Sequence, residues 1–298
     1  MGIFFTVVLP IIAIFGAGFI LQRIRVLDVK SIATTSIYIF LPALVFTSLY
    51  EAEYDKGFTI IIIFALFLLF MMILINKVLA RMFKWNQSVE SATILTTAFM
   101  NGGNYGVPVI LYSVGSSALP YAIFFMVLQS LIMNFFGVYY ASRSKNGISR
   151  ALKTIFKMPA TYAALLAFIF QKIPWEIPEA VYSSLSMLGD AAIPIMMVML
   201  GMQLASITSL KFNWQVLTSA VIVRMVISPV LAVLFIMAFD VNTLIGSVLL
   251  IVASMPSAAT TTMYAIEFDT EPDMVSSITL VTTLISIFSL TILLNFIV

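Results

Sequence analysis

Apolar stretches of about 20 residues, the length of a membrane-crossing helix, recur along this chain of 298 residues. A helix of that length spans the roughly 30 Å hydrocarbon layer of a bilayer. Only 9% of the residues are charged and 62% are hydrophobic, whereas a soluble domain carries about 25% charged residues. The sequence therefore predicts an all-α polytopic membrane protein without a sizeable soluble domain.

We expect ten transmembrane spans joined by short polar connections. Their predicted ranges are 3–22, 32–50, 58–80, 92–113, 118–141, 156–171, 180–205, 214–239, 243–266 and 273–297. The first, third, fifth and seventh connections hold twelve of the 15 lysine and arginine residues, the even-numbered connections hold two, and Arg224 lies inside a span. Because basic connections stay in the cytoplasm, we expect a cell (inner) membrane protein with both termini extracytoplasmic. The ninth connection is acidic, but acidic residues weigh little in this rule.

A second pattern is an internal repeat. When the second half is shifted back by 152 positions, three pairs of residues coincide: Pro194 with Pro42, Tyr264 with Tyr112, and Pro272 with Pro120. Each unit contains five spans, so the two copies would cross the membrane in opposite senses, as in many transporters. We therefore expect a first repeat at 1–141, a cytoplasmic linker at 142–155 and a second, inverted repeat at 156–298.

Both repeats are expected to break the same span. The fourth contains NGGNYGVP at 101–108, and the shift sets it opposite ASMPSAAT at 253–260 in the ninth. Irregular backbone at membrane depth is tolerated only where it faces protein or a water-filled cavity, and half-helices that begin there would present free N–H groups to an anion. The candidate substrate-binding residues are Asn101, Gly102, Asn104, Gly106, Pro108, Pro256, Ser257, Thr260 and Thr261. The alternative is that the glycines only allow close helix packing.

Two charged residues lie deep inside apolar spans, Asp190 in the seventh and Arg224 in the eighth. Each follows the start of its span by about ten residues, which is near mid-membrane at about 1.5 Å per residue. Charged residues inside the membrane are energetically costly, so they suggest a functional role. Asp190 could couple protons to transport, and Arg224 could attract an organic anion. The alternative is that each charge only satisfies a neighbouring group, which could be the other charge. We expect Gln129, Asn134 and Gln203 to hydrogen-bond between helices.

The composition excludes several kinds of catalytic site. The chain has no cysteine and no histidine, so thiolate catalysis, HExxH zinc sites and serine–histidine chemistry are not available. An intramembrane aspartyl protease needs two carboxylates at one depth, and Asp190 has no such companion in its span. We therefore expect no enzyme, no cofactor, no metal site and no nucleic-acid partner.

Four motifs, in order along the chain, resemble the auxin efflux carrier family, which includes the plant PIN auxin carriers and bacterial carboxylate permeases. Asn101, Gly106 and Pro108 match its N-x(4)-G-x-P signature. Arg224 and Pro229 match an arginine five residues before a proline in its eighth span. The ninth and seventh spans of the family are similar to MPSAATTTMYAIEFDTEPDMVSS and LGDAAIPIMMVMLGMQLA. The chain lacks the long central loop of the plant carriers, which makes it more similar to bacterial members.

The resemblance implies a fold like that of sodium/proton antiporters and bile acid carriers. The fourth and ninth spans would cross as broken helices, with Pro108 and Pro256 at the crossing and Asn101 near the substrate's carboxylate. Spans 1, 2, 6 and 7 would form a scaffold that pairs in a homodimer. Spans 3–5 and 8–10 would form a mobile transport domain of the elevator type, without an obvious metal-ion site.

We therefore interpret the sequence as a secondary carrier for a small organic carboxylate such as malate, malonate or an auxin-like indole carboxylate, working by alternating access. The alternatives are a sodium-coupled organic anion symporter of the bile acid type and a passive anion channel. A saturable flux with a modest turnover would separate a carrier from a channel. The carboxylate, the direction of transport and coupling to a proton or sodium stay open.

Overall fold

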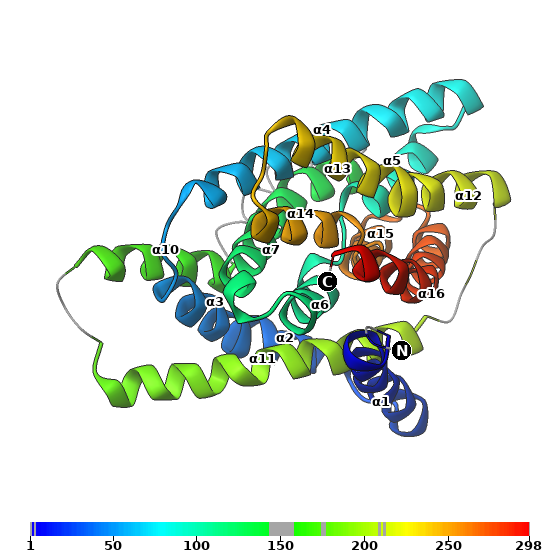
Figure 1. Ribbon diagram of the computed structural model, residues 1–298. Helices are drawn as coiled ribbons and strands as arrows, with labels where there is room; N and C mark the ends of the chain where they lie inside the picture. The colour runs from blue at the N-terminus through cyan, green and yellow to red at the C-terminus, as the bar shows by residue number, and fades with distance from the viewer. Residues whose placement is uncertain are drawn as a thin grey trace.

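The computed structural model describes residues 2, 4–142, 158–173, 177–207, 210 and 213–297. In these residues every regular element is a helix, apart from one isolated β-bridge (Figure 1). In the part of the chain that the structure describes, seven helical segments are long and apolar enough to cross a membrane: Phe4–Arg25, Val29–Tyr50, Lys56–Phe83, Ser116–Ala141, Glu179–Ala205, Trp214–Ala238 and Pro272–Ile297. An all-helical, multi-pass membrane protein is confirmed at this level, whereas the ten-span inverted repeat stays a prediction.

Several of the long segments are built from consecutive helical pieces. The elements are η1 (Phe4–Val8), α1 (Leu9–Arg25), α2 (Val29–Thr35), η2 (Ser36–Phe40), α3 (Leu41–Tyr50), α4 (Lys56–Phe83), η4 (Ser116–Ala118), α7 (Leu119–Ile132), η5 (Met133–Gly137), α8 (Val138–Ala141), α10 (Pro159–Lys172), α11 (Glu179–Ala205), α12 (Trp214–Ile222), η6 (Val223–Ile227), α13 (Ser228–Ala238) and α16 (Pro272–Ile297). All η pieces here are π-helical except η4, which is a 3₁₀-helix. π-helical turns are rare in proteins as a whole but are often found at functional sites. The segments η5 and η6 are therefore candidate parts of a functional site.

Two further segments are interrupted helices. In the first, α5 (Gln87–Ala98) is followed by η3 (Gly102–Gly106) and α6 (Val107–Ser113); in the second, α14 (Thr243–Ala253) is followed by α15 (Thr260–Phe268). The octet predicted to break the fourth span lies mostly after the interruption. Its glycines form the π-helical segment η3, and Pro108 lies in the first turn of α6, where proline is tolerated.

Asparagine caps define where both interrupted segments begin. The side chain of Asn86 accepts from Val89 N over 2.9 Å, and that of Asn242 accepts from Ile245 N over 2.9 Å. Such caps satisfy backbone N–H groups that the first turn of a helix leaves unpaired. The predicted linker at 142–155 lies outside the described residues except for Ser142.

In the helix packing, α1 lies against α11, and α3 packs on both α10 and α11. Helix α4 packs on α5, α7 and α13, and α16 packs on α5 and α12; contacts of α3 and α10 with α7 join these two sets of helices. The α1–α11 crossing is close because glycine occupies it: a Cβ atom on Gly201 would lie 1.9 Å from Phe15 O. In Figure 1, α6 and α14 lie between α11 on one side and α4 on the other.

Candidate functional site

The two helix interruptions meet in space. The backbone N–H of Asn101 donates to Pro256 O over 2.8 Å, and that of Ala258 donates to Phe99 O over 2.9 Å. These bonds form an antiparallel β-bridge between Met100 and Ser257. Each extended segment therefore satisfies backbone groups of the other, as irregular backbone at membrane depth requires.

Ser257 fastens this crossing to two neighbouring helices. Its hydroxyl donates to Thr96 O in α5 over 2.5 Å and accepts from Thr282 Oγ1 in α16 over 3.2 Å. Its backbone N–H donates to the same threonine oxygen over 3.3 Å. Ser257 is fully buried, so its side chain holds the crossing together.

A cavity of about 480 Å³ lies against the crossing. Its lining includes residues 102–104, where η3 begins, and residues 258–260, where α15 begins, so the N-terminal ends of both second half-helices reach it. Of the nine candidate residues, four line the cavity: Asn101, Gly102, Asn104 and Thr260. The other five are buried and do not belong to its lining: Gly106, Pro108, Pro256, Ser257 and Thr261.

Two buried amide N–H donors and one buried amide acceptor, Gln203 Oε1, line this cavity without a hydrogen-bond partner among the described residues; the two donors bear on the ligand. They are Nδ2 of Asn101 and Nε2 of Gln129, which α7 contributes. The two side chains are only 5% and 7% exposed. A buried donor that is left unpaired costs about 1–3 kcal/mol, so two such donors beside one cavity favour a ligand that brings acceptor atoms.

The three amides expected to bond between helices have different outcomes. Asn134 makes such a bond, because Tyr264 Oη of α15 donates to its Oδ1 over 2.8 Å. In Gln129 the buried Nε2 has no hydrogen-bond partner among the described residues, and in Gln203 the buried Oε1 has none. The expected bonds between helices are therefore missing at these two atoms. Asn134 and Tyr264 both line the cavity, so their hydrogen bond forms part of its wall.

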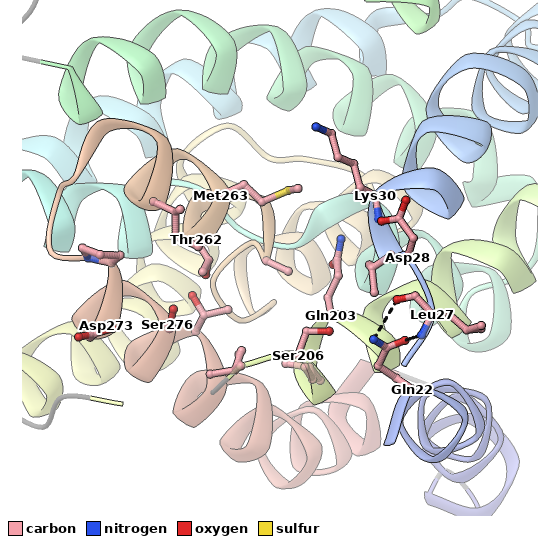
Figure 2. A pocket seen from close by; sticks show the side chains of 17 residues that line it. Gln22, Leu27, Asp28, Lys30, Gln203, Ser206, Thr262, Met263, Asp273 and Ser276 are labelled. Atoms are coloured by element: carbon pink, nitrogen blue, oxygen red, sulfur yellow. Dashed lines mark hydrogen bonds between the residues drawn. The ribbon is translucent and has the colours of Figure 1, made fainter. Parts of the chain in front are cut away.

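A second cavity of about 490 Å³ adjoins the first (Figure 2). Figure 2 shows side chains entering it from the end of α1, the start of α2, the end of α11, α15 and α16. Four residues line both cavities: Lys30, Gln203, Ala259 and Met263. Among the described residues, the first lining contains Lys30 and no aspartate or glutamate, whereas the second also contains Asp28 and Asp273. The first cavity therefore has the sign of charge that suits an anion.

The two intramembrane charges lie in different surroundings. Arg224 is 0% exposed, and its Nη1 donates to Thr97 O over 2.7 Å. Its Nη2 donates to Ser228 Oγ and to Ala253 O. Asp190 is exposed on α11. Within the described residues the two charges do not pair with each other, whereas Arg224 does bond to neighbouring groups, as the structural alternative allowed.

The whole chain matches a known family. The family model described as membrane transport protein, which is that of the auxin efflux carriers, matches residues 3–294. The chain belongs to the auxin efflux carrier family. It is 30% identical over 296 residues to an uncharacterized transporter of Methanothermobacter thermautotrophicus, covering 95% of each chain. It is 27% identical over 264 residues to an uncharacterized transporter of Methanocaldococcus jannaschii, covering 84% of each chain.

A plant relative is more distant. Auxin efflux carrier component 8 of Arabidopsis thaliana is 23% identical over 133 residues, which are 43% of this chain and 36% of the plant protein. This auxin efflux carrier family member is therefore a membrane transporter, as the family resemblance indicated.

In this auxin efflux carrier family member, both Gln129 and Lys30 line the cavity, but neither was assigned to the binding site from the sequence. Gln129 is one of two amide side chains in the apolar run 118–141, and Lys30 was counted only among the basic residues of a connection. The only available signal for Gln129 was its polarity inside a span, which Asn134 shares. Their position beside the crossing depends on contacts between helices that are far apart in sequence.

Proposed function

We propose that this transporter carries a small organic carboxylate, which binds in the cavity beside the crossed interruptions. The observation that carries the proposal is the pair of unpartnered amide donors on Asn101 and Gln129, which line a cavity reached by two helix N-termini. Its volume of about 480 Å³ lies within the range of small-molecule sites, about 300–1,000 Å³.

The chemistry of the lining favours an anion. A helix N-terminus carries about half a positive charge, and exposed N–H groups there bind carboxylate and phosphate oxygens. The helical run of η3 and α6, Gly102–Ser113, and α15 both begin at the cavity. A carboxylate with two acceptor oxygens would satisfy the amides of Asn101 and Gln129, while Lys30 adds a positive charge at the edge.

The proposal includes alternating access by two groups of helices. In it, ten spans form two inverted repeats of five, with spans 1, 2, 6 and 7 as a scaffold and spans 3–5 and 8–10 as a transport domain. Support comes from the packing of α1, α3, α10 and α11 on one another, and from the fact that the cavity is lined both by α11 and by the interrupted helices. The homodimer expected from the family remains part of this proposal.

The cavity would open to the cytoplasm in this conformation. Its lining includes Lys30, next to the first connection, and Met158, at the end of the fifth. Both connections belong to the basic set expected on the cytoplasmic side. The conformation would therefore be inward-facing, and transport would require the transport group to move until the cavity meets the opposite face.

The test is a transport assay on purified protein in liposomes, with transient currents recorded as mono- and dicarboxylates are applied. Asn101→Ala and Gln129→Ala each remove one donor to the carboxylate. A hydrogen bond to a charged group contributes about 1.5–3 kcal/mol, so each variant should weaken the apparent affinity by about 10- to 150-fold. Asn295→Ala is a matched control, because that amide is exposed at the end of α16 and bonds within its own helix.

The two outcomes separate site from function. A saturable response to one acid, weakened in both variants and unchanged in Asn295→Ala, supports the carrier and its site. An unchanged response in Asn101→Ala and Gln129→Ala would keep the carrier and move the binding site elsewhere. If folded wild-type protein gives no response to any carboxylate, the proposal of an organic anion carrier is wrong.

A further inference from the structure

The buried guanidinium of Arg224 lies where two helix C-termini come together. The last carbonyls of a helix have no partner within it, and they carry about half a negative charge in total. Thr97 lies in the last turn of α5, and Ala253 is the last residue of α14. Arg224 donates to the carbonyl oxygens of both, so one side chain joins the ends of the two first half-helices.

The charges at this point balance. Two helix C-termini together present about one negative charge, and the guanidinium supplies one positive charge. Within the described residues, its hydrogen-bond partners are the two carbonyls and the hydroxyl of Ser228, none of them is a carboxylate, and its Nε has no partner. The Ser228 hydroxyl also donates to Ala253 O over 2.7 Å. A fully buried arginine needs compensation, and here the helix ends provide it.

Local structure fixes the guanidinium in this position. Arg224 lies in the π-helical segment η6, which packs against α5 and α16. Pro229 follows at the start of α13, and Ser228 lies beside the guanidinium. Since π-helical turns inside α-helices occur frequently at functional sites, the distortion of this helix is consistent with a requirement for the arginine.

We propose that Arg224 is the built-in cation of the crossing: its guanidinium neutralises the C-termini of α5 and α14, so the carrier needs no bound sodium ion there. Without it, two negative helix ends would be buried beside each other, and a mobile cation would have to take its place. Arg224 is thus a positioning residue, because it holds the crossing whose opposite ends reach the cavity. The sodium statement rests on the proposed carrier function, whereas the statement about the crossing does not.

The first test is chemical rescue of Arg224→Ala by guanidinium ions, with thermal unfolding as a readout that needs no substrate. The variant should unfold at a lower temperature than wild type, and millimolar guanidinium chloride should raise that temperature saturably. Choline chloride at the same ionic strength should have no such effect. Arg81→Ala is the matched control, because Arg81 is exposed at the end of α4, and it should respond to neither salt. If guanidinium leaves folded Arg224→Ala unchanged, the proposal is wrong.

The second test uses transport in liposomes. Arg224→Ala should lose at least about tenfold in rate, since it leaves Thr97 O without the guanidinium donor, leaves Ala253 O with only the Ser228 hydroxyl, and removes the positive charge between the two helix ends; guanidinium should restore part of the rate. Arg224→Lys keeps the positive charge and should retain more transport than Arg224→Ala; equal losses in two folded variants would contradict the proposal. Wild type should transport equally well in sodium and in choline, and a sodium requirement would overturn the proposal even if Arg224→Ala does not fold. Rescue of unfolding without any carboxylate transport would reject the proposed substrate and leave this inference intact.

Discussion

Replacing Gly201 by alanine should loosen the contact between α1 and α11. Among the glycines of the described residues, Gly201 is the one at which an added Cβ atom would come nearest to another atom. A Cβ atom at Gly201 would lie 1.9 Å from Phe15 O and 2.8 Å from the carbonyl carbon of the same residue. On the facing helix, a Cβ atom at Gly18 would lie 2.1 Å from Val198 O. These neighbours are backbone atoms, so no side-chain rotation can relieve the overlap. The helices would have to move apart by about 1 Å or more, at the cost of the packing around them.

The magnitude follows from overpacking. Inserting one carbon into a tightly packed contact costs about 1–3 kcal/mol, and each kcal/mol shifts the unfolding temperature of a chain of this size by about 2–4 °C. We therefore expect Gly201→Ala to unfold about 2–12 °C below wild type. The assay is thermal unfolding of the purified protein in detergent, followed by intrinsic fluorescence. Lipid-bound samples measured in the same way would check that detergent does not create the difference.

Gly16→Ala is the control, because Gly16 lies in α1 as well, and a Cβ atom there would meet no atom within 4 Å. Alanine stabilises a helix by about 0.5–1 kcal/mol relative to glycine, so Gly16→Ala should unfold at the same temperature as wild type or above it. The two variants make the same chemical change on facing helices. Gly201→Ala should lower the unfolding temperature, and Gly16→Ala should not. Equal unfolding temperatures for Gly201→Ala and Gly16→Ala would refute the close crossing.

Two further predictions concern the residues around the cavities. Lys30→Gln should raise the apparent KM for an anionic substrate by a few-fold at low salt and less at high salt, because ions screen an exposed charge; the exposed Lys77→Gln serves as control, and a loss that does not depend on salt would argue against an electrostatic role. Asp28 caps α2, and its hydrogen bonds, first from the Ser31 hydroxyl and then from Lys30 N, hold its pKa below the ordinary value of 3.8. A lowered pKa contributes stability that is present above the ordinary value and is lost as the pH falls through the lowered one. The protection of the amides in residues 29–35, measured as the exchange rate relative to the intrinsic rate at the same pH, should therefore decrease on acidification below about pH 3.8, and Asp28→Ala should remove this decrease.

Local sequence patterns predicted the helical, multi-pass character of the chain, because apolar runs of the right length indicate membrane-crossing helices. The caps Asn86 and Asn242, at which α5 and α14 begin, were not used in that prediction. The composition of NGGNYGVP predicted an irregular region, but the helix is interrupted at 99–101 and the octet mostly continues as η3 and α6. Glycine and asparagine allow several backbone conformations, so their presence indicates that a helix can be distorted without fixing where it opens.

The candidate site was predictable only in part, because its contacts join residues that are distant in sequence. Asn101 was identified from its signature and does line the cavity. The partners of Arg224 lie 127 and 29 positions away along the chain, and no local pattern indicates which carbonyls a buried guanidinium will reach. Asp190, chosen for its depth in a span, is exposed on α11. The position of a charged residue within a predicted span thus indicates that its burial would be costly, but it does not reveal which groups surround the side chain.

The electrostatics of the crossing relate the two proposals to each other. Four half-helices meet there, and their ends are segregated: the C-termini of α5 and α14 meet the guanidinium of Arg224, while η3–α6 and α15 begin at the cavity. Since each pair of helix ends carries about one unit of charge, the negative pair is balanced within the chain by one arginine. The positive pair lies beside a lining that contains no aspartate or glutamate among its described residues. A bound carboxylate would balance that pair as Arg224 balances the other, which explains why the ligand should be an anion and the fixed charge a cation.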